Sequence, residues 1–297
     1  MIDVTVVQYT LFFLAVLAVL AVVLPILGSR SCIPLFPLLG RWIRWVLFGV
    51  LFAVSLKHFD LSYRADWVHF VSGLALWFIL ETSYNWIAIK ALSGSDLPLF
   101  PQFYVNTDGD EWPADQRYIE LREWLRSEDY KHLSSLKAEL FAGMCLRACV
   151  YESSDSFTRI QILLMPTRKG GSAASYTVRT RTQEGQCVIT DNLSLPYGGY
   201  YPSSWNICRK PLIGSPRRLL SLHKNRLIRM NVQATGTEDS AVEEINEQQR
   251  ILERLNTDTG FLVPRHLHEE EGKITPNGRY RLWKEMWLIA YLGKPIL

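Results

Sequence analysis

The sequence predicts a membrane-anchored α+β protein with three N-terminal transmembrane helices, a linker and a cytoplasmic domain. Three long apolar segments precede residue 93. Four short segments with strand character, separated by turn residues, follow one another between residues 145 and 190 and predict a four-stranded antiparallel meander. Helical periodicity then dominates to the C-terminus. We therefore divide the chain into a transmembrane region (1–92), a linker (93–113) and an α+β domain (114–297).

The composition of the whole chain hides two unlike parts. Of 32 basic and 29 acidic residues, 26 basic and 24 acidic ones lie in residues 97–297, so this part is close to neutral. Near-neutrality argues against nucleic acid as a partner, because nucleic-acid binding depends on a basic surface. An odd number of widely spaced cysteines is a poor disulfide framework and favours a reducing compartment. The five are Cys32, Cys145, Cys149, Cys187 and Cys208.

The first predicted span, Gln8–Leu27, contains no charged residue. A bilayer core about 30 Å thick requires about 20 helical residues, which this segment supplies. No Lys or Arg precedes it, whereas a secretory signal peptide has a positive N-terminal region. We therefore expect a retained helix that contacts the lipid bilayer.

Two further spans are expected at Arg41–Phe59 and from Trp67 to Ile87. The connection between the first two spans, with its flanks, carries three basic residues, against two in the next connection. The positive-inside rule then predicts a multi-pass protein with its N-terminus outside and its C-terminal domain cytoplasmic. These basic residues are Arg30, Arg41 and Arg44, then Lys57 and Arg64.

The second and third spans predict a helical hairpin. Counting helix rise from the connection places Arg44 level with Thr82, and therefore close to Glu81. A carboxylate at membrane depth is costly and is usually paired. We expect an Arg44–Glu81 ion pair that clamps the hairpin. The alternative, an ion or proton site, would need several titratable groups, and only His69 offers another.

The pattern of the domain begins with helices and continues with strands. Connectors rich in Ser, Asp and Gly separate the strands. The predicted helices are Ala114–Ser127 and Lys131–Phe141, and the predicted strands are Cys145–Glu152, Phe157–Leu164, Ser175–Thr182 and Gln186–Thr190.

An irregular aromatic loop, Asp191–Pro216, precedes three predicted helices. The first of them is basic and amphipathic, which suits contact with anionic lipid or a solvated face. The candidates for lipid contact are Arg218, Arg226 and Arg229. The three helices are Pro216–Met230, Glu238–Asn256 and Thr275–Leu292.

A candidate pocket for an anionic ligand lies between one face of the predicted sheet and the aromatic loop. Cationic side chains beside aromatic ones suit such a ligand. The candidate residues are Arg179, Arg181, Tyr197, Tyr200, Trp205, Arg217, Arg218 and His223.

No sequence motif for catalysis or cofactor binding stands out. The chain has no G-x-S-x-G, Walker, Rossmann or kinase signature. His266 and His268 form the most metal-like cluster, but they lack an ordered ligand set. We therefore expect no cofactor, no metal and no catalytic residues.

These patterns favour a membrane-anchored, non-enzymatic subunit or scaffold whose cytoplasmic domain binds a protein partner or a second copy of itself. Abundant Tyr and Trp suit such an interface. The alternatives are a sensory domain for an anionic ligand and an enzyme of unrecognised type. A concave Arg-rich pocket would favour the first alternative, and a titratable group with a strongly shifted pKa in a cleft would favour the second.

Overall fold

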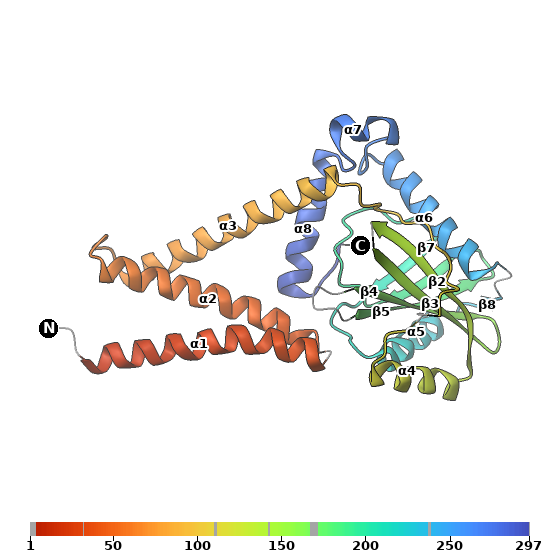
Figure 1. Cartoon of the computed structure of the whole chain (residues 1–297), viewed down its shortest axis with the longest axis horizontal. Coiled ribbons are helices and arrows are strands. Elements are labelled where there is room, and N and C mark those ends of the chain that lie inside the picture. The colour runs from red at the N-terminus through yellow and green to blue at the C-terminus, as the bar shows by residue number, and fades with distance from the viewer. Residues whose placement is uncertain are drawn as a thin grey trace.

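The computed structural model describes residues 4–31, 33–109, 112–141, 143–166, 172–236 and 239–296. Three long helices extend from one side of a domain built from one sheet and shorter helices (Figure 1). The helices are α1 (Val4–Ser31), α2 (Leu35–His58), α3 (Asp66–Gly94), α4 (Gln116–Ser127), α5 (Pro216–Met230), α6 (Ala241–Asp258), α7 (His268–Glu271) and α8 (Pro276–Leu292), with a 3₁₀ turn η1 (Arg265–Leu267). The strands are β1 (Tyr104–Val105), β2 (Tyr130–Phe141), β3 (Met144–Ser153), β4 (Thr158–Pro166), β5 (Ser172–Thr182), β6 (Cys187–Asp191), β7 (Trp205–Arg209) and β8 (Ala234–Thr235).

Two of the long helices are apolar enough to cross a membrane. By length and composition, Gln8–Gly28 within α1 and Leu35–His58, which is α2, both qualify. Their outward side chains are largely apolar, which indicates membrane association. The third predicted span falls in α3, which carries Asp66, Glu81 and Lys90 and is not one of these two helices.

Two glycines let α2 and α3 approach closely. A Cβ added to Gly73 would lie 2.9 Å from Cβ of Phe52 and 3.0 Å from Cα of Gly49. A Cβ on Gly49 would lie 2.8 Å from the ring of Phe70. Small residues at a helix crossing bring the two backbones together, as in membrane helix pairs. The predicted hairpin of these two helices is therefore present in the structure.

The sheet is larger than the predicted meander. Its strands lie in the order β1-β2-β3-β4-β5-β6-β7, and β8 pairs with β5. The four predicted strands correspond to β3, β4, β5 and β6, which are consecutive antiparallel neighbours. β7 runs parallel to β6, so the sheet is mixed.

Two segments of the domain differ from their predicted structure. Lys131–Phe141, predicted as a helix, lies in β2, which pairs with β3 along almost its whole length. Its Leu, Lys, Ala and Glu residues favour helix locally, but pairing with β3 outweighs that weak preference. The loop Asp191–Pro216 contains β7, because the tertiary structure brings Trp205–Arg209 beside β6. The other predicted domain helices correspond to α4, α5, α6 and α8.

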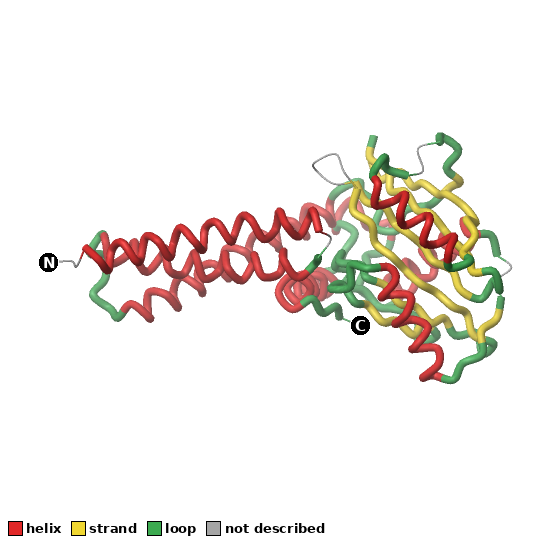
Figure 2. The backbone as a smooth tube through the Cα atoms, turned by 90° about the horizontal axis from the view of Figure 1, so that it is seen from below, coloured by secondary structure: helices red, strands yellow, loops and turns green. Residues whose placement is uncertain are grey.

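Helices cover both faces of the sheet (Figures 1 and 2). On one face, α4 and α5 bury Leu125 and Leu219 against Ile162 and other sheet residues. On the other face, α6 packs Ile245 against Leu136 and its neighbours. Amphipathic helices on a two-sided apolar sheet give the three-layer arrangement of a compact domain.

The domain is fixed directly to the end of α3. Ile89 of α3 is buried against Phe261, Ile274 and Leu282. The carbonyl oxygen of Ser93 accepts a hydrogen bond from the backbone N–H of Lys273 at 2.8 Å. Helix α8 runs across the ends of the long helices and is seen end-on in Figure 2. The predicted linker (93–113), of which residues 110 and 111 lie outside the described residues, therefore begins within a packed junction, because Ser93 and Gly94 still belong to α3.

Candidate functional site

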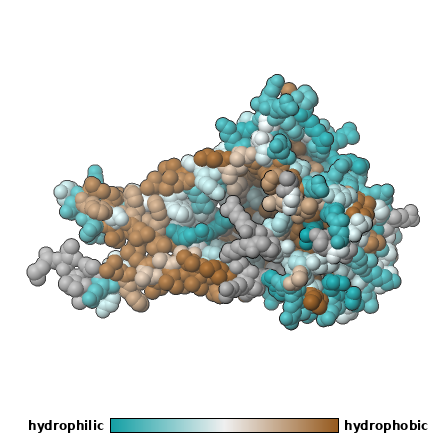
Figure 3. Space-filling view, in the orientation of Figure 1, coloured by the Kyte–Doolittle hydropathy of each residue, from teal (hydrophilic) through white to brown (hydrophobic). Residues whose placement is uncertain are grey.

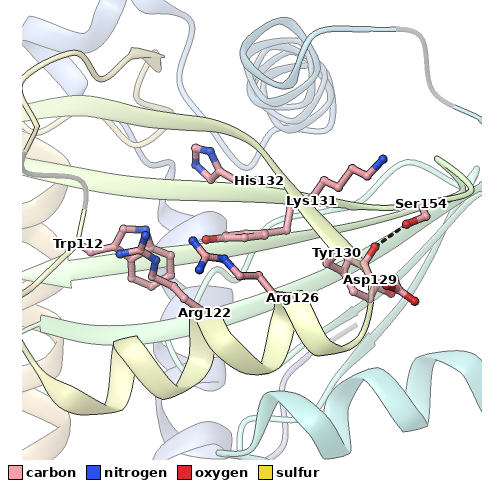
Figure 4. Close-up of a pocket in the computed structure, with 9 residues that line it drawn as sticks. Trp112, Arg122, Arg126, Asp129, Tyr130, Lys131, His132 and Ser154 are labelled. Carbon is pink, nitrogen blue, oxygen red and sulfur yellow. Dashed lines mark hydrogen bonds between the residues drawn. The ribbon is translucent and has the colours of Figure 1, made fainter.

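A pocket of about 480 Å³ opens between α4 and the first residues of β2 (Figure 4). Basic and aromatic side chains dominate its wall, and one carboxylate lies at its end. The lining residues are Trp112, Arg122, Arg126, Asp129, Tyr130, Lys131, His132, Tyr151 and Ser154.

Helix α4 positions two of the basic groups. Asp115 caps the helix by accepting a hydrogen bond from the backbone N–H of Arg117 at 3.0 Å. The buried Leu125 holds the opposite face of the helix in the core. Arg122 and Arg126 stand four residues apart, so they lie on the same side of α4, toward the pocket. The guanidinium of Arg122 also lies over the ring of Trp112, 5.9 Å from its centre.

Strand β2 supplies the other basic groups, Lys131 and His132. His132 Nε2 lies 2.9 Å from Ser135 Oγ, and its ring packs edge-on against Tyr151. Arg122, Arg126 and Lys131 form no ion pair with any carboxylate of the described residues. Two guanidinium groups therefore face a pocket whose only lining carboxylate among those residues is Asp129, whereas the ammonium group of Lys131 is directed away from them (Figure 4). Such a site favours an anion, because charged hydrogen bonds to Arg are strong.

The pocket adjoins an open edge of the sheet. β1 pairs with β2 only at Leu136 and Lys137. Within the described strands, residues 130–132 and Ser134 pair with β3 on one side, with an irregularity at Leu133, and with no strand on the other. An exposed strand edge can add an extended segment of another chain by backbone hydrogen bonds.

The two sheet arginines predicted to bind a ligand, Arg179 and Arg181, form ion pairs within the domain. Arg179 is largely but not fully buried and lies 2.7 Å from Glu244, which also pairs with the buried Arg159 at 2.5 Å. Burial alone would raise the pKa of Glu244, but Arg179 and Arg159 outweigh it and hold that pKa below its ordinary value. Arg181 pairs with Asp239 at 3.5 Å. The structure therefore places Arg179 in an internal ion-pair cluster.

The aromatic loop is held down by two fully buried polar side chains, Glu285 of α8 and Asn256 of α6. The Tyr197 N–H donates to Glu285 Oε2 at 2.8 Å, and the Tyr200 N–H donates to Asn256 Oδ1 at 2.7 Å. Trp205 begins β7 and is half-buried. These contacts give Tyr197 and Tyr200 a structural role in closing this side of the domain.

His223 is also an internal residue. Its ring nitrogens lie 3.0 Å from Thr180 Oγ1 and 2.9 Å from Thr190 Oγ1, and the residue is fully buried. Burial, and secondarily the charge of Arg226, lower the pKa of His223 to about 3. His223 therefore stays neutral inside the fold and faces none of the described pockets.

Of the arginines of the basic helix α5, some contact the rest of the domain and others are exposed to solvent. Arg226 donates to the Ile189 carbonyl oxygen at 2.6 Å and to Asn206 Oδ1, so it fixes α5 to the sheet. Arg217 lies over the ring of Trp124 at 5.7 Å. Arg218 and Arg229 are exposed. The sequence pattern placed Arg226 with the free arginines, because periodicity does not reveal which partners a side chain meets.

Arg44 and Glu81 line one cleft, but no ion pair between them occurs in the part of the chain that the structure describes. Arg44 Nε donates to the Gly40 carbonyl oxygen at 3.3 Å. Glu81 Oε2 instead accepts hydrogen bonds from Trp77 Nε1 at 2.9 Å, Trp45 Nε1 at 3.3 Å and the Tyr291 hydroxyl. One of these neutral donors, Tyr291, belongs to α8. The predicted pairing of Arg44 with Glu81 considered only the α2–α3 hairpin and so could not include it.

Sequence reasoning missed the basic pocket between α4 and β2. Its one local signal is the four-residue spacing of Arg122 and Arg126 on a predicted helix. The strand that completes the pocket was predicted as a helix, so Lys131 and His132 were not expected beside them. Comparisons with protein-family models, with curated proteins and with solved structures found no match.

Proposed function

We propose that this protein is a membrane-anchored, non-enzymatic binding protein whose cytoplasmic domain holds a protein partner by an acidic, extended segment. The observation that carries the proposal is the basic pocket between α4 and β2, beside an open strand edge. Arg122 and Arg126 would hold carboxylates of the partner, while residues 130–134 would offer backbone hydrogen bonds.

A protein segment suits this site better than a compact small ligand. The two arginines of α4 lie beside a row of backbone groups of β2, so charge and strand pairing can act along one extended chain. Trp112 and Tyr151 add aromatic surface, which is common where proteins meet.

The membrane part of the proposal has three spans, with α3 as the third. Close packing at Gly49 and Gly73 ties α3 to the apolar helix α2. Several outward residues of α3 are large and apolar, which suits lipid contact: Trp67, Val71, Phe78, Ile79, Leu80 and Ile87. The excess of basic residues between the first two spans supports a cytoplasmic domain.

Peptide binding tests the proposed partner chemistry. A fluorescent decaglutamate peptide should bind the full-length protein in detergent micelles, whereas decaglutamine should not. Arg122→Gln with Arg126→Gln should raise the dissociation constant of decaglutamate at least about tenfold, because the loss of one charged hydrogen bond weakens binding by about that factor. Fluorescence anisotropy gives both dissociation constants.

Arg250→Gln with Arg254→Gln is the matched control for the peptide experiment. It removes two positive charges from exposed positions on α6, across the sheet from the pocket, and should leave binding unchanged. Equal binding by wild type and the Arg122/Arg126 variant would contradict the proposal. Inorganic phosphate that binds as tightly as the peptide would assign the pocket to a small anion instead.

Thiol labelling tests the third span and the orientation. Tyr63→Cys lies between α2 and α3, and Glu184→Cys lies in an exposed turn of the domain. We expect a membrane-impermeant maleimide to label Tyr63→Cys in intact cells and Glu184→Cys only after permeabilisation, with the wild-type thiols as background. Labelling of both from the same side would show that α3 does not cross the membrane.

A further inference from the structure

A second cleft, of about 390 Å³, lies where α2 and α3 meet α8 and the loop before β7. Two cationic groups of α2 and one carboxylate of α3 line it: Arg41, Arg44 and Glu81. Figure 3 shows hydrophilic surface at this end of the long helices, between hydrophobic surfaces. The cleft therefore combines charges of both signs at the level where the apolar helices reach the domain.

The carboxylate of Glu81 is fixed by one oxygen. Trp45, Trp77 and Tyr291 all donate to Oε2, and no described residue donates to Oε1. Burial, and then the hydrogen bond to Glu81, raise the pKa of Tyr291, so its hydroxyl remains a donor. Oε1 is thus left to interact with whatever occupies the cleft.

The two arginines are available to an anion. Among the described residues, neither Arg41 nor Arg44 forms an ion pair with a carboxylate, and the recorded hydrogen bond of Arg44 uses Nε alone. Guanidinium groups bind phosphate with paired, directional hydrogen bonds. At a membrane surface the most abundant phosphates are those of lipid headgroups.

We propose that this cleft binds the headgroup of a zwitterionic phospholipid that carries a primary amine, such as phosphatidylethanolamine. Arg41 and Arg44 hold the phosphate, and Glu81 Oε1 holds the ammonium group. A purely anionic headgroup would face the Glu81 carboxylate, and a lone amine would face the two arginines. The inference rests on the proposed embedding of α2 and α3 in the membrane.

The lipid chains have a surface to follow. Tyr84 lines the cleft and is 68% exposed, and Leu80 lies one helical turn from it, away from the domain. Leu80 and Ile79 are exposed as well, so apolar surface of α3 leads from the headgroup site toward the membrane.

Native mass spectrometry of the full-length protein tests the proposal. The protein is ejected from nanodiscs that contain equal parts of phosphatidylethanolamine, phosphatidylcholine and phosphatidylglycerol. We expect wild type to retain phosphatidylethanolamine preferentially. Glu81→Gln should reduce that preference about tenfold, and Arg41→Gln with Arg44→Gln should reduce retention of all three lipids about tenfold.

Lys57→Gln with Arg64→Gln is the matched control, because it removes two positive charges at the opposite end of the same hairpin. It should leave the retention of all three lipids unchanged. Preferential retention of phosphatidylglycerol by wild type, or no effect of the arginine changes, would overturn the proposal. The wild-type comparison needs no variant to fold. Carbonate extraction tests the membrane embedding separately. Release of the protein from the membrane would refute the proposed anchor. A protein that stays in the membrane but shows no lipid preference would refute only the headgroup site.

Discussion

Replacing Glu285 by Ala is expected to lower the free energy of unfolding of the domain by about 3–5 kcal/mol, the usual cost of breaking a buried charged network. Glu285 is fully buried and accepts hydrogen bonds from the backbone N–H groups of Tyr197 and Gly198. Its other oxygen lies 4.0 Å from Arg209 Nη1. Alanine would leave both N–H groups without an acceptor. Arg209 would keep its ion pair with Asp191.

Chemical denaturation of the full-length protein in micelles measures this loss, and hydrogen exchange at residues 197–200 locates it. The neighbouring change Lys284→Ala is the control, since Lys284 is exposed on the same helix and should cost less than about 0.5 kcal/mol. A Glu285→Ala variant with wild-type stability and unchanged exchange in the loop would show that this carboxylate does not hold the loop.

Acid should destabilise the domain through His223. Its pKa is about 3 in the folded protein, against an ordinary value of 6.5. Below pH 6.5 His223 binds a proton in the unfolded chain but not in the folded chain. The stability that neutral His223 gives is therefore complete above pH 6.5 and falls by about 1.4 kcal/mol per pH unit as the pH drops toward 3.

Unfolding free energies of wild type and His223→Gln, measured from pH 7 to pH 5, test this prediction. The stability difference between the two proteins should shrink as the pH falls, because Gln keeps hydrogen-bonding groups but does not titrate in this range. His266→Gln is the control, since His266 is exposed and its loss should leave the slope of wild type intact. A slope unaffected by His223→Gln would contradict the buried neutral histidine.

Local pattern predicted several elements of this protein well. The amphipathic segment Pro216–Met230 is a helix with the predicted bounds, and the four segments between residues 145 and 190 are adjacent strands. Their signals are period and turn chemistry, which act over a few residues. Long apolar runs likewise identify α1 and α2 as helices that can cross a membrane.

Partner choice could not be predicted in the same way. Arg179, Arg226 and His223 looked like ligand or lipid groups in the sequence, but Glu244, Asn206 and two threonines hold them inside the fold. Arg44 was expected to meet Glu81, yet indole and phenol donors from α2, α3 and α8 reach the carboxylate. Each of these contacts joins residues far apart in the chain.

The sequence by itself determined where this chain is apolar, that four segments of the domain are amphipathic helices, and that four segments between residues 145 and 190 are strands, because these properties depend on neighbouring residues. Only the tertiary structure decided that Lys131–Phe141 is a strand, that the sheet has eight strands within the described residues, and which charged groups have no ion-pair partner there. Long-range pairing outweighs local propensities of less than about 1 kcal/mol per residue. The basic pocket depends on the pairing of β2 with β3, and the second cleft depends on the packing of α8 against α2 and α3.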